Sequence, residues 1–402
     1  MKLLYVARAR IPTEKAHGLQ IMKMCEAFAK LGLDIELVLP FRIQTKFLKG
    51  RNAFEYYGVK KIFNIKKLPI PDLIYFTGFL PEKISIILFH IHDIIFSIFA
   101  LFYSLIKNPD VIFTRDSKVA FLLSIFKPVI YESHIYPSSK IDLYFEKNAL
   151  KRCGFFITIT KKLKKVYLQN GFDEKKIHVL PDGVDIEKFD IDISKEEARK
   201  KLNLNFKEKL AIYTGHLYPW KGVYTLVDAS NFLNAKVILV GGLKEDIKKI
   251  KEYISKKNIN NVVVLGYVEP REIPFYLKAA DILVLPNSAN DVKSIYCTSP
   301  LKLFEYMASK RPIVASNLPS IGEILNNSNA ILVEPDKPET LAEGIKKVLG
   351  DKKLAKKIAD KAYHDVRKYS WESRAKKIIT LVMKLESWSN SSRKPQREVF
   401  LR

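Results

Sequence analysis

The sequence predicts an α/β protein with two Rossmann-like domains that face each other across a cleft. The chain has 402 residues, more than a single core comfortably holds and suited to two domains of roughly 150–200 residues each. Apolar, strand-like segments alternate with helical ones, which is the pattern of a parallel sheet covered by helices. The opening unit of strand, glycine-containing loop and helix also occurs a second time, near the middle of the chain.

The first unit begins at the N-terminus. Residues 2–8 have the apolar pattern of a strand, and residues 12–18 (PTEKAHG) form a loop. Residues 19–31 have helical apolar spacing, with Gly32 as the stop signal. Further strands of this half are expected at residues 34–40, 111–114, 128–132 and 155–160.

The second unit begins with a strand at residues 209–214, followed by a loop at 215–222 and a helix at 223–233. Ligands of open parallel sheets bind beyond the carboxyl ends of the strands. The loops after these strands are therefore the first place to look for a site. Further strands of this half are expected at residues 235–240, 261–265, 282–285 and 312–315.

The expected organisation has four parts. Residues 1–185 form the N-terminal Rossmann-like domain, and residues 186–370 form the C-terminal one. A helix at 371–386 packs back on the first domain. The tail at 387–402 is polar, lacks periodicity and is expected to be loosely ordered.

The chain is strongly basic, with a formal net charge of +25. Such a surface attracts phosphate in nucleic acid, anionic lipid or phosphorylated substrates. A lysine-rich solvated surface accounts for the charge equally well. Because the basic residues are dispersed and no nucleic-acid-binding motif accompanies them, we expect no nucleic-acid partner.

The three cysteines, Cys25, Cys153 and Cys297, lie far apart and form no CxxC motif. This distribution indicates a reducing compartment and provides neither a disulfide framework nor a zinc site. The apolar run at the N-terminus meets Arg8 and Arg10 and is too short for a signal peptide. We therefore expect a cytoplasmic protein, without a metal ion.

One apolar stretch, residues 84–106, approaches the length of about 20 residues that spans a bilayer. His90, His92 and Asp93 lie in its middle, and a central aspartate costs roughly 2.5–3.5 kcal/mol on insertion. We expect one or two apolar helices here, buried or at a membrane surface, rather than a span. The same side chains could suggest a metal cluster, but residues two apart do not share a helix face, so a structural role is preferred.

The segment before residue 301 has the features of a helix start. Ser299 is expected to be the N-cap and Pro300 the first helical residue. The free amides from Leu301 onward would bind a phosphate or carboxylate, and the hydroxyls of Thr298 and Ser299 add donors. Capped helices without any ligand have the same pattern, so this signal alone does not decide between structure and function.

Two charged residues lie on the first turns of the same helix. Lys302 adds a positive charge close to the free amides, and Glu305 lies one turn further on the same face. A carboxylate at that place could accept hydrogen bonds from two ribose hydroxyls.

A loop and a turn in the second half could complete a site. Lys221 would point into the cleft, although a lone lysine in such a loop is usually a surface residue. The loop that carries it includes Gly215, His216 and Gly222. Backbone groups near Tyr267 and Val268 could hydrogen-bond the edge of a base.

In their order and spacing, these elements resemble the family-4 glycosyltransferases, which have the GT-B architecture. The family's Gly-Arg-Leu-x3-Lys-Gly loop corresponds to residues 215–222, and its Gly-x-Val turn to residues 266–268. Its Glu-x7-Glu helix, with the Pro-Val-Val stretch that follows, corresponds to residues 297–315. The resemblance extends over about residues 2–385. It implies a retaining sugar transfer from a nucleotide-diphosphate sugar, with no cofactor and no metal ion.

The resemblance also assigns roles to residues. Lys221 is expected to contact the distal phosphate of the donor, the amides after Ser299 to hold the pyrophosphate, and Glu305 to bind the ribose. His17 and Gly18 stand where the family has a glycine-rich loop near the donor phosphate and the acceptor. His134 matches the family's active-site histidine. His134 and Lys221 are thus the expected catalytic residues.

Two positions depart from the family pattern. His216 stands where the family has a phosphate-binding arginine, and a neutral histidine would hold phosphate less well. Cys297 stands where the family has the first glutamate of the Glu-x7-Glu pair, which lies beside the donor sugar. These differences could reflect another sugar, a carboxylate from elsewhere such as Asp291, or a loss of activity.

The identity of the acceptor is open at this point. The first domain selects the acceptor in the family, and here it is rich in aromatic and isoleucine-rich stretches with scattered lysine and arginine. They suit a glycan or lipid-linked acceptor and a peripheral contact with the anionic inner face of the membrane. Two alternatives stand beside transfer: a sugar-nucleotide epimerase of the same architecture, and a non-catalytic subunit that binds a sugar nucleotide.

Overall fold

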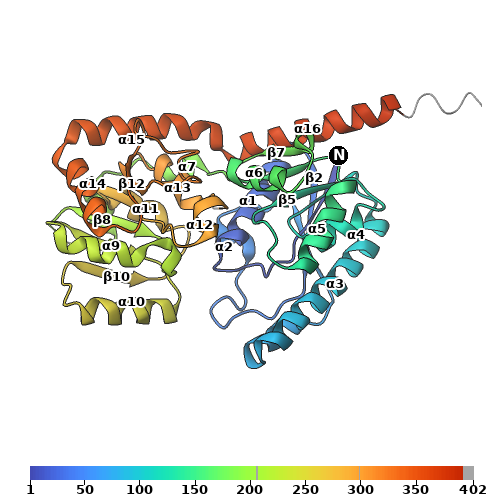
Figure 1. Cartoon of the computed structure of the whole chain (residues 1–402), viewed down its shortest axis with the longest axis horizontal. Helices are drawn as coiled ribbons and strands as arrows, with labels where there is room; N and C mark the ends of the chain where they lie inside the picture. Colours follow the sequence, from blue (N-terminus) through green and yellow to red (C-terminus); the bar gives the residue numbers. More distant parts are fainter. Residues whose placement is uncertain (205–206, 298, 393–402) are drawn as a thin grey trace, which may run out of the picture.

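The structure, a computed structural model of the chain, describes residues 1–204, 207–297 and 299–392, and only the backbone of residues 385–392. In these ranges it contains two separate parallel sheets, each with helices on both faces. Figure 1 shows the first domain on the right and the second on the left, with α15 and α16 running along the top. The predicted α/β fold with two Rossmann-like domains is confirmed.

The first sheet has the strand order β3-β2-β1-β4-β5-β6-β7, and all its neighbouring strands are parallel. Its strands are β1 (Lys2–Val6), β2 (Asp34–Pro40), β3 (Asn64–Leu68), β4 (Val111–Thr114), β5 (Val129–Ser133), β6 (Phe156–Thr158) and β7 (Ile177–Val179). Successive side chains of a strand point to opposite faces. Accordingly, Leu3 and Tyr5 of β1 lie in one apolar core and Leu4 and Val6 in another.

Helices α1 (Ala16–Lys30) and α3 (Glu82–Lys107) cover opposite faces of this sheet, because Phe28 lies in one of its cores and Phe96 in the other. The remaining helical segments of this half are α2 (Ala53–Tyr57), α4 (Ser117–Leu123), α5 (Lys140–Arg152), α6 (Lys161–Gln169) and the 3-10 turns η1 (Leu73–Phe79) and η2 (Glu174–Lys176).

The second sheet has the order β10-β9-β8-β11-β12-β13 and is also parallel throughout. Its strands are β8 (Leu210–Thr214), β9 (Lys236–Val240), β10 (Val262–Gly266), β11 (Ile282–Leu285), β12 (Ile313–Ser316) and β13 (Ile331–Val333). The central strands are fully buried, which explains why they read as unbroken apolar runs in the sequence.

The helices of the second domain surround this sheet in the same way (Figure 1). They are α7 (Ile186–Phe189), α8 (Lys195–Lys201), α9 (Val223–Ala229), α10 (Lys244–Lys256), α11 (Ile273–Ala279), α12 (Val292–Tyr296), α13 (Leu301–Ala308), α14 (Pro338–Gly350) and α15 (Lys352–Val366). Short 3-10 turns lie at η3 (Pro219–Lys221), η4 (Ser230–Phe232) and η5 (Arg367–Tyr369).

Each of the ten expected strands is present, with ends that differ by one or two residues. Three strands were not predicted. β3 (NIKKL) is a polar edge strand, and β7 and β13 have only three residues each, too few to show a periodicity. The predicted loop at 12–18 is shorter than expected, because α1 already begins at Ala16.

Residues 84–106 lie within a single helix, α3, rather than in two. The side chains of its central Asp93 and His92 are buried against the first domain, whereas most of its apolar side chains are exposed. The sequence left open whether this segment is a core helix or a surface helix, and the structure places it on the surface.

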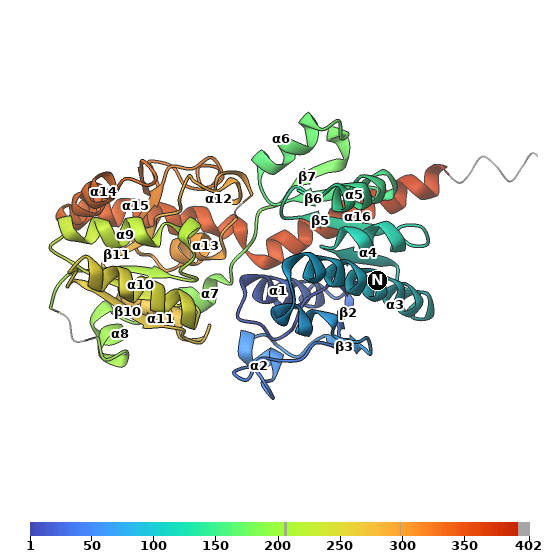
Figure 2. The same cartoon turned by 60° about the horizontal axis from the view of Figure 1, so that its bottom comes forward.

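The chain passes between the domains twice. Leu180 lies in a core of the first domain and Val184 in a core of the second, so the first crossing falls between them. The second crossing is made by α16 (Trp371–Ser392), whose Trp371, Ala375 and Ile378 pack in the first domain beside α1 (Figure 2). We expected this helix to end at residue 386, but it continues to Ser392. Residues 393–402 of the expected loose tail lie outside the described residues.

A buried ion pair joins α16 to the first sheet. Arg374 Nη2 donates to Glu132 Oε2 at 2.7 Å, and its Nε donates to the carbonyl of Pro181 at 2.8 Å. Both charged side chains are almost fully buried. Burial by itself would raise the pKa of the Glu132 carboxyl, but Arg374 and His134 together hold that pKa well below its usual value.

Replacing Arg374→Met should lower the free energy of unfolding by about 3–5 kcal/mol, because the Glu132 carboxylate would stay buried without its main partner. The matched control is Lys30→Met, which removes the exposed 2.8 Å ion pair with Glu372 on the same helix and should cost less than about 1 kcal/mol. Urea denaturation of both variants measures the difference. Equal losses would show that the buried pair does not hold α16 in place.

Candidate functional site

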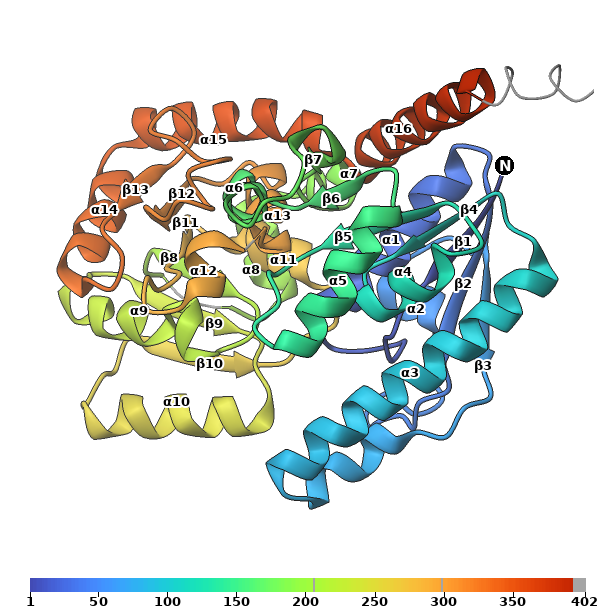
Figure 3. The same cartoon turned by 45° about the vertical axis from the view of Figure 1, so that its right-hand side comes forward.

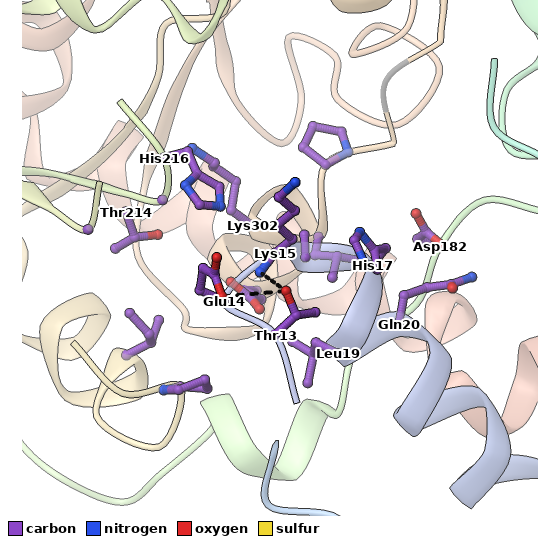
Figure 4. Close-up of a pocket in the computed structure, with 18 of the residues that line it drawn as sticks. Thr13, Glu14, Lys15, His17, Leu19, Gln20, Asp182, Thr214, His216 and Lys302 are labelled. Atoms are coloured by element: carbon purple, nitrogen blue, oxygen red, sulfur yellow. Dashed lines mark hydrogen bonds between the residues drawn. The ribbon is translucent and has the colours of Figure 1, made fainter. Parts of the chain in front are cut away.

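A cavity of about 390 Å³ lies between the two domains, at the carboxyl ends of the strands of both sheets. Figure 4 shows His216 and Lys302 of the second domain on one side, and His17, Gln20 and Asp182 on the other. The expected site residues that line this cavity are His17, His134, Gly215, His216, Lys221, Tyr267, Val268, Cys297, Ser299, Pro300, Leu301, Lys302 and Glu305.

Three expected site residues are placed differently. Gly18 is buried behind the cavity, where an added Cβ would lie 2.2 Å from the hydroxyl of Tyr57. Gly222 also lies behind it, packed against the carbonyl of Pro286. Both glycines therefore allow close packing rather than forming part of the cavity wall. Thr298 lies outside the described residues.

Helix α13 begins beside the cavity, and its start differs from the prediction. The N-cap residue is Pro300 and not Ser299, and Pro300 has no side chain that could cap the helix. The hydroxyl of Ser299 instead accepts a hydrogen bond of 3.1 Å from the amide of Asp182. Among the described residues, no capping side chain accepts a hydrogen bond from the first amides of α13, and such a helix N-terminus attracts anions.

Two lysines of the second domain reach the same cavity without an acidic partner. Lys302 Nζ is buried, lies 3.7 Å from the ring centroid of Tyr213 and has no hydrogen-bond partner among the described residues. Lys221 Nζ lies 3.7 Å from the ring centroid of Trp220. Within the described part of the chain, neither ammonium group comes within 4.0 Å of a carboxylate oxygen in an ion pair.

Burial changes the protonation of both lysines. It lowers the pKa of Lys221 to about 7. Burial lowers the pKa of Lys302 well below its usual value, and the charge of Lys221 lowers it further. An anion that enters the cavity would stabilise the protonated form of both groups, so the cavity suits a negatively charged ligand.

His216 is a neutral part of this wall. Burial and then the charges of Lys302 and Lys221 lower its pKa. Its ring stacks on the ring of Tyr218 with a centroid distance of 4.9 Å. The ammonium group of Lys302 lies close to this histidine in space, because a Cβ added at the neighbouring Gly215 would be 2.8 Å from Lys302 Nζ. Lys302 therefore places a positive charge beside position 216, where the family has an arginine.

Glu305 also lines the cavity. Burial raises the pKa of its carboxyl to about 6, and the charges of Lys188 and Lys302 partly oppose that change. Lys188 comes from α7, in the segment where the chain crosses between domains. At neutral pH Glu305 is therefore mostly a carboxylate, able to accept hydrogen bonds from hydroxyl groups.

His134 contacts Glu132, the carboxylate of the buried ion pair with Arg374. Its Nε2 lies 2.5 Å from Glu132 Oε1, and the same oxygen accepts a hydrogen bond of 2.8 Å from Gln20. Burial lowers the pKa of His134, followed by the charge of Arg115, although Glu132 acts in the opposite direction. The histidine faces the cavity in a fixed orientation.

Asp182 is a second acidic group of the cavity that the sequence analysis did not single out. Burial raises the pKa of its carboxyl, and its Oδ1 has no hydrogen-bond partner among the described residues. His17 lies on the same side, and burial lowers its pKa to about 4. On this side of the cavity, a ligand would therefore meet two neutral histidines, His17 and His134, and the carboxyl group of Asp182, whose Oδ1 has no hydrogen-bond partner among the described residues.

The turn at Tyr267 and Val268 is covered by the first domain. The hydroxyls of Tyr56 and Tyr267 lie 2.7 Å apart, and Phe47 packs edge-on against the Tyr267 ring at 5.1 Å. Arg51 Nη1 forms a 3.0 Å ion pair with Glu269. These contacts join the two domains beside Tyr56 and Tyr267, which both line the cavity.

Cys297 lines the cavity where a carboxylate was expected, and burial raises the pKa of its thiol. Asp291, the suggested substitute, does not line the cavity; its carboxylate accepts a hydrogen bond from the amide of Lys293 at the start of α12. Across the described residues, no three His, Cys, Asp or Glu side chains gather in a way that could hold a metal ion.

Several cavity residues were not predicted as site residues. They come from different loops and helices, which meet only in the folded chain. They are Thr13, Glu14, Lys15, Gln20, Tyr56, Arg115, Asp182, Lys188, Gly241 and Gly242.

Comparisons with known proteins agree with this geometry. Residues 18–188 match the model described as Glycosyltransferase Family 4, and residues 194–365 match that of the Glycosyl transferases group 1. Crystal structures of Anabaena HepE with UDP and glucose have the same fold, with a TM-score of 0.74 at 18% identity over 96% of this chain and 100% of that one.

Two relatives are similar in sequence over part of their length. The uncharacterized glycosyltransferase MJ1607 of Methanocaldococcus jannaschii is 29% identical over 56% of this chain and 58% of its own. The UDP-Gal:alpha-D-GlcNAc-diphosphoundecaprenol alpha-1,3-galactosyltransferase of Escherichia coli is 27% identical over 48% of this chain and 49% of its own. The chain spans about six-tenths of the length of the first of the curated relatives that it matches.

Replacing Gly222→Ala should disturb the loop that carries Lys221. Gly222 has a φ of +70°, and an added Cβ would lie 1.7 Å from the carbonyl oxygen of Pro286, so the loop would have to move. Gly32→Ala is the matched control, since its φ of +84° gives the same strain with nothing within 4 Å. We expect a loss of about 1–2 kcal/mol for the control and a larger loss for Gly222→Ala in denaturation experiments. Equal losses would contradict a tightly packed loop.

Proposed function

This chain belongs to the family-4-like glycosyltransferases of the GT-B architecture, and we propose that it transfers a sugar from a nucleotide-diphosphate sugar to a glycan or lipid-linked acceptor. The observation that carries the proposal is a pair of lysines at the N-terminus of α13, the buried Lys302 and the partly buried Lys221, for which no described residue supplies an ion-pair partner. A buried unpaired charge is costly, and a diphosphate would relieve that cost.

The donor fits the cavity in three parts. The diphosphate lies against the first amides of α13 and the two ammonium groups, where charge-assisted hydrogen bonds are strongest. The ribose hydroxyls donate to Glu305, which lies on the same helix as Lys302. The base lies near Tyr267 and Val268, at the end that Tyr56 of the first domain covers.

The reaction depends on the charge that develops on the leaving diphosphate. Lys221, Lys302 and the first residues of α13 line the same cavity. Positive groups and amide donors that are already in place when the charge develops stabilise an anionic transition state. We propose that these groups make a metal ion and any other cofactor unnecessary, and that the transfer retains the configuration of the sugar. Lys302 supplies the positive charge that the neutral His216 does not.

The acceptor enters from the first domain. His134 and Asp182 face the place where an acceptor hydroxyl would approach the sugar, and His134 is kept in position by Glu132. One relative is named for transfer to a diphosphoundecaprenol-linked sugar, which favours a lipid-linked acceptor here. We place the protein in the cytoplasm, peripherally on the inner face of the membrane.

The function is tested by incubating the purified chain with a panel of nucleotide sugars, with and without polyprenyl-diphosphate-linked sugars, and by measuring the nucleoside diphosphate released. Release that requires both substrates supports transfer. Conversion of the nucleotide sugar without an acceptor would identify an epimerase. Binding without turnover would identify a non-catalytic subunit, the alternative that the neutral His216 and Cys297 favour.

Replacing Lys302→Met should produce opposite effects on binding and stability. The affinity for a nucleotide sugar should fall by about 10- to 100-fold, because the variant loses a hydrogen bond between a charged group and the diphosphate. The free protein should become more stable, because an unpaired buried amine is replaced by an apolar side chain of similar length. Calorimetric titration and thermal unfolding measure the two effects.

Two further variants complete this test. Lys221→Ala should lower turnover far more than stability, and Lys293→Met, which removes an exposed lysine on the neighbouring helix α12, should change neither. If Lys302→Met lost stability and kept its affinity, Lys302 would be a structural residue and the assignment would be wrong.

A further inference from the structure

The longest exposed apolar surface of the described chain lies on α3 and on η1, which packs beside it. Phe79 and Ile106 at its two ends are 79% and 81% exposed. We name it the α3–η1 surface. Its exposed side chains are Tyr75, Phe76, Phe79, Leu80, Ile84, Ile86, Ile87, Phe89, Ile91, Ile94, Ile98, Phe99, Phe102, Leu105 and Ile106. Exposed patches of this extent on a soluble protein mark an interaction site.

The opposite face of α3 is attached to the first domain by apolar side chains in the core, Phe96 and Ala100, and by buried polar side chains. Asp93 is buried, forms an ion pair with Arg8 and lies 3.5 Å from the ammonium group of Lys118. Ser97 and Ser104 are buried on the same face and donate to carbonyls of the helix itself. The apolar side chains therefore cannot turn inward, since that would expose the core and break the ion pairs.

The composition of α3 is that of a segment in contact with lipid. Its 26 residues have a mean hydropathy of 2.1 over the most apolar window, and only 28% of that window is buried. By length and composition alone it could cross a bilayer. However, crossing would require Asp93 to leave Arg8 and Lys118 and enter the hydrocarbon, where an unpaired carboxylate is strongly disfavoured.

Positive charge borders this surface. Lys83 is exposed in the first turn of α3, and Lys66 and Lys67 are exposed on the edge strand β3 beside it. Lys107 lies in the last turn, where it also approaches Glu36 at 3.8 Å. Lysines around an apolar helix face are complementary to anionic lipid headgroups, whereas a second copy of this chain would bring the same positive charges together.

The placement of α3 suits contact with a flat surface. In Figures 1 and 3 the helix runs along the outside of the first domain, and its N-terminal end projects beyond the sheet.

We propose that the α3–η1 surface lies in the plane of an anionic bilayer, with its apolar side chains at the boundary between headgroups and acyl chains and Asp93 still held by the first domain. The inference rests on the proposed function in that the membrane would then deliver a lipid-linked acceptor to the cleft. It identifies the surface that holds the protein to the membrane and excludes a membrane span by α3.

The proposal is tested by flotation of the full chain with vesicles of phosphatidylcholine, with and without phosphatidylglycerol. The wild-type protein should float with the vesicles that contain phosphatidylglycerol. The double variant Ile87→Glu, Phe102→Glu places two carboxylates on the surface and should bind roughly tenfold or more weakly. Phe232→Glu, at a similarly exposed aromatic position of the second domain, should float like the wild type.

Three results would overturn the proposal: wild type that does not float, a double variant that floats normally, or protein that resists extraction by alkaline carbonate and is therefore membrane-spanning. A wild-type dimer in light scattering that the double variant abolishes would assign the surface to a second copy instead. Thermal stabilisation by nucleoside diphosphates, measured without lipid, checks that the variants are folded. It also separates this proposal from the proposed function, since donor binding does not require α3.

Discussion

The positive charge at the start of α13 is the feature on which the account of this protein depends. Lys221 and Lys302 come from two different βα connections of the second sheet, and both end beside the same helix N-terminus in the cavity. No acidic side chain among the described residues balances them in an ion pair. Burial lowers the pKa of both amines, and an anion beside them would stabilise their charged form.

The rest of the site is built around that anion position by the way the chain passes between the domains. The first crossing places Asp182 and Lys188 in the cavity, and the return through α16 brings Arg374 to Glu132, which in turn orients His134. In the proposed function, Lys221, Lys302 and Glu305 of the second domain face the donor, and His134 of the first domain faces the acceptor. A movement of one domain against the other would therefore change the distance between the two groups of residues, while each group would keep its own geometry.

Much of the fold could be predicted because its signals are local. Buried central strands such as β8 and β11 appear as apolar runs, and Gly32 ends the first helix. The edge strand β3 was missed because three of its five residues are polar or charged, and the length of α16 was underestimated because its end lacks apolar periodicity. The sequence also could not show which face of α3 is buried, since both faces contain isoleucine and phenylalanine.

The site was predictable only where its residues share a motif. Lys302 and Glu305 lie one turn apart on one helix, and Lys221 follows a recognisable strand and loop. Asp182, Arg115 and Arg374 have no such signal, because their positions depend on how distant loops and the last helix meet. The N-cap was misassigned since Ser299 satisfies the usual preference but uses its hydroxyl to accept from Asp182 across the domain junction.

The most direct measurement is calorimetric titration of the protein with its nucleotide sugar in two buffers of different ionisation enthalpy, slightly above pH 7. If the diphosphate is held by Lys221 and Lys302, the protein should take up protons from the buffer on binding, because both amines gain stability in their charged form. Lys221→Arg, whose guanidinium stays charged, should reduce that uptake while binding persists. Tight binding with no proton uptake in either buffer would show that the buried lysines do not hold the diphosphate, and the central claim would be wrong.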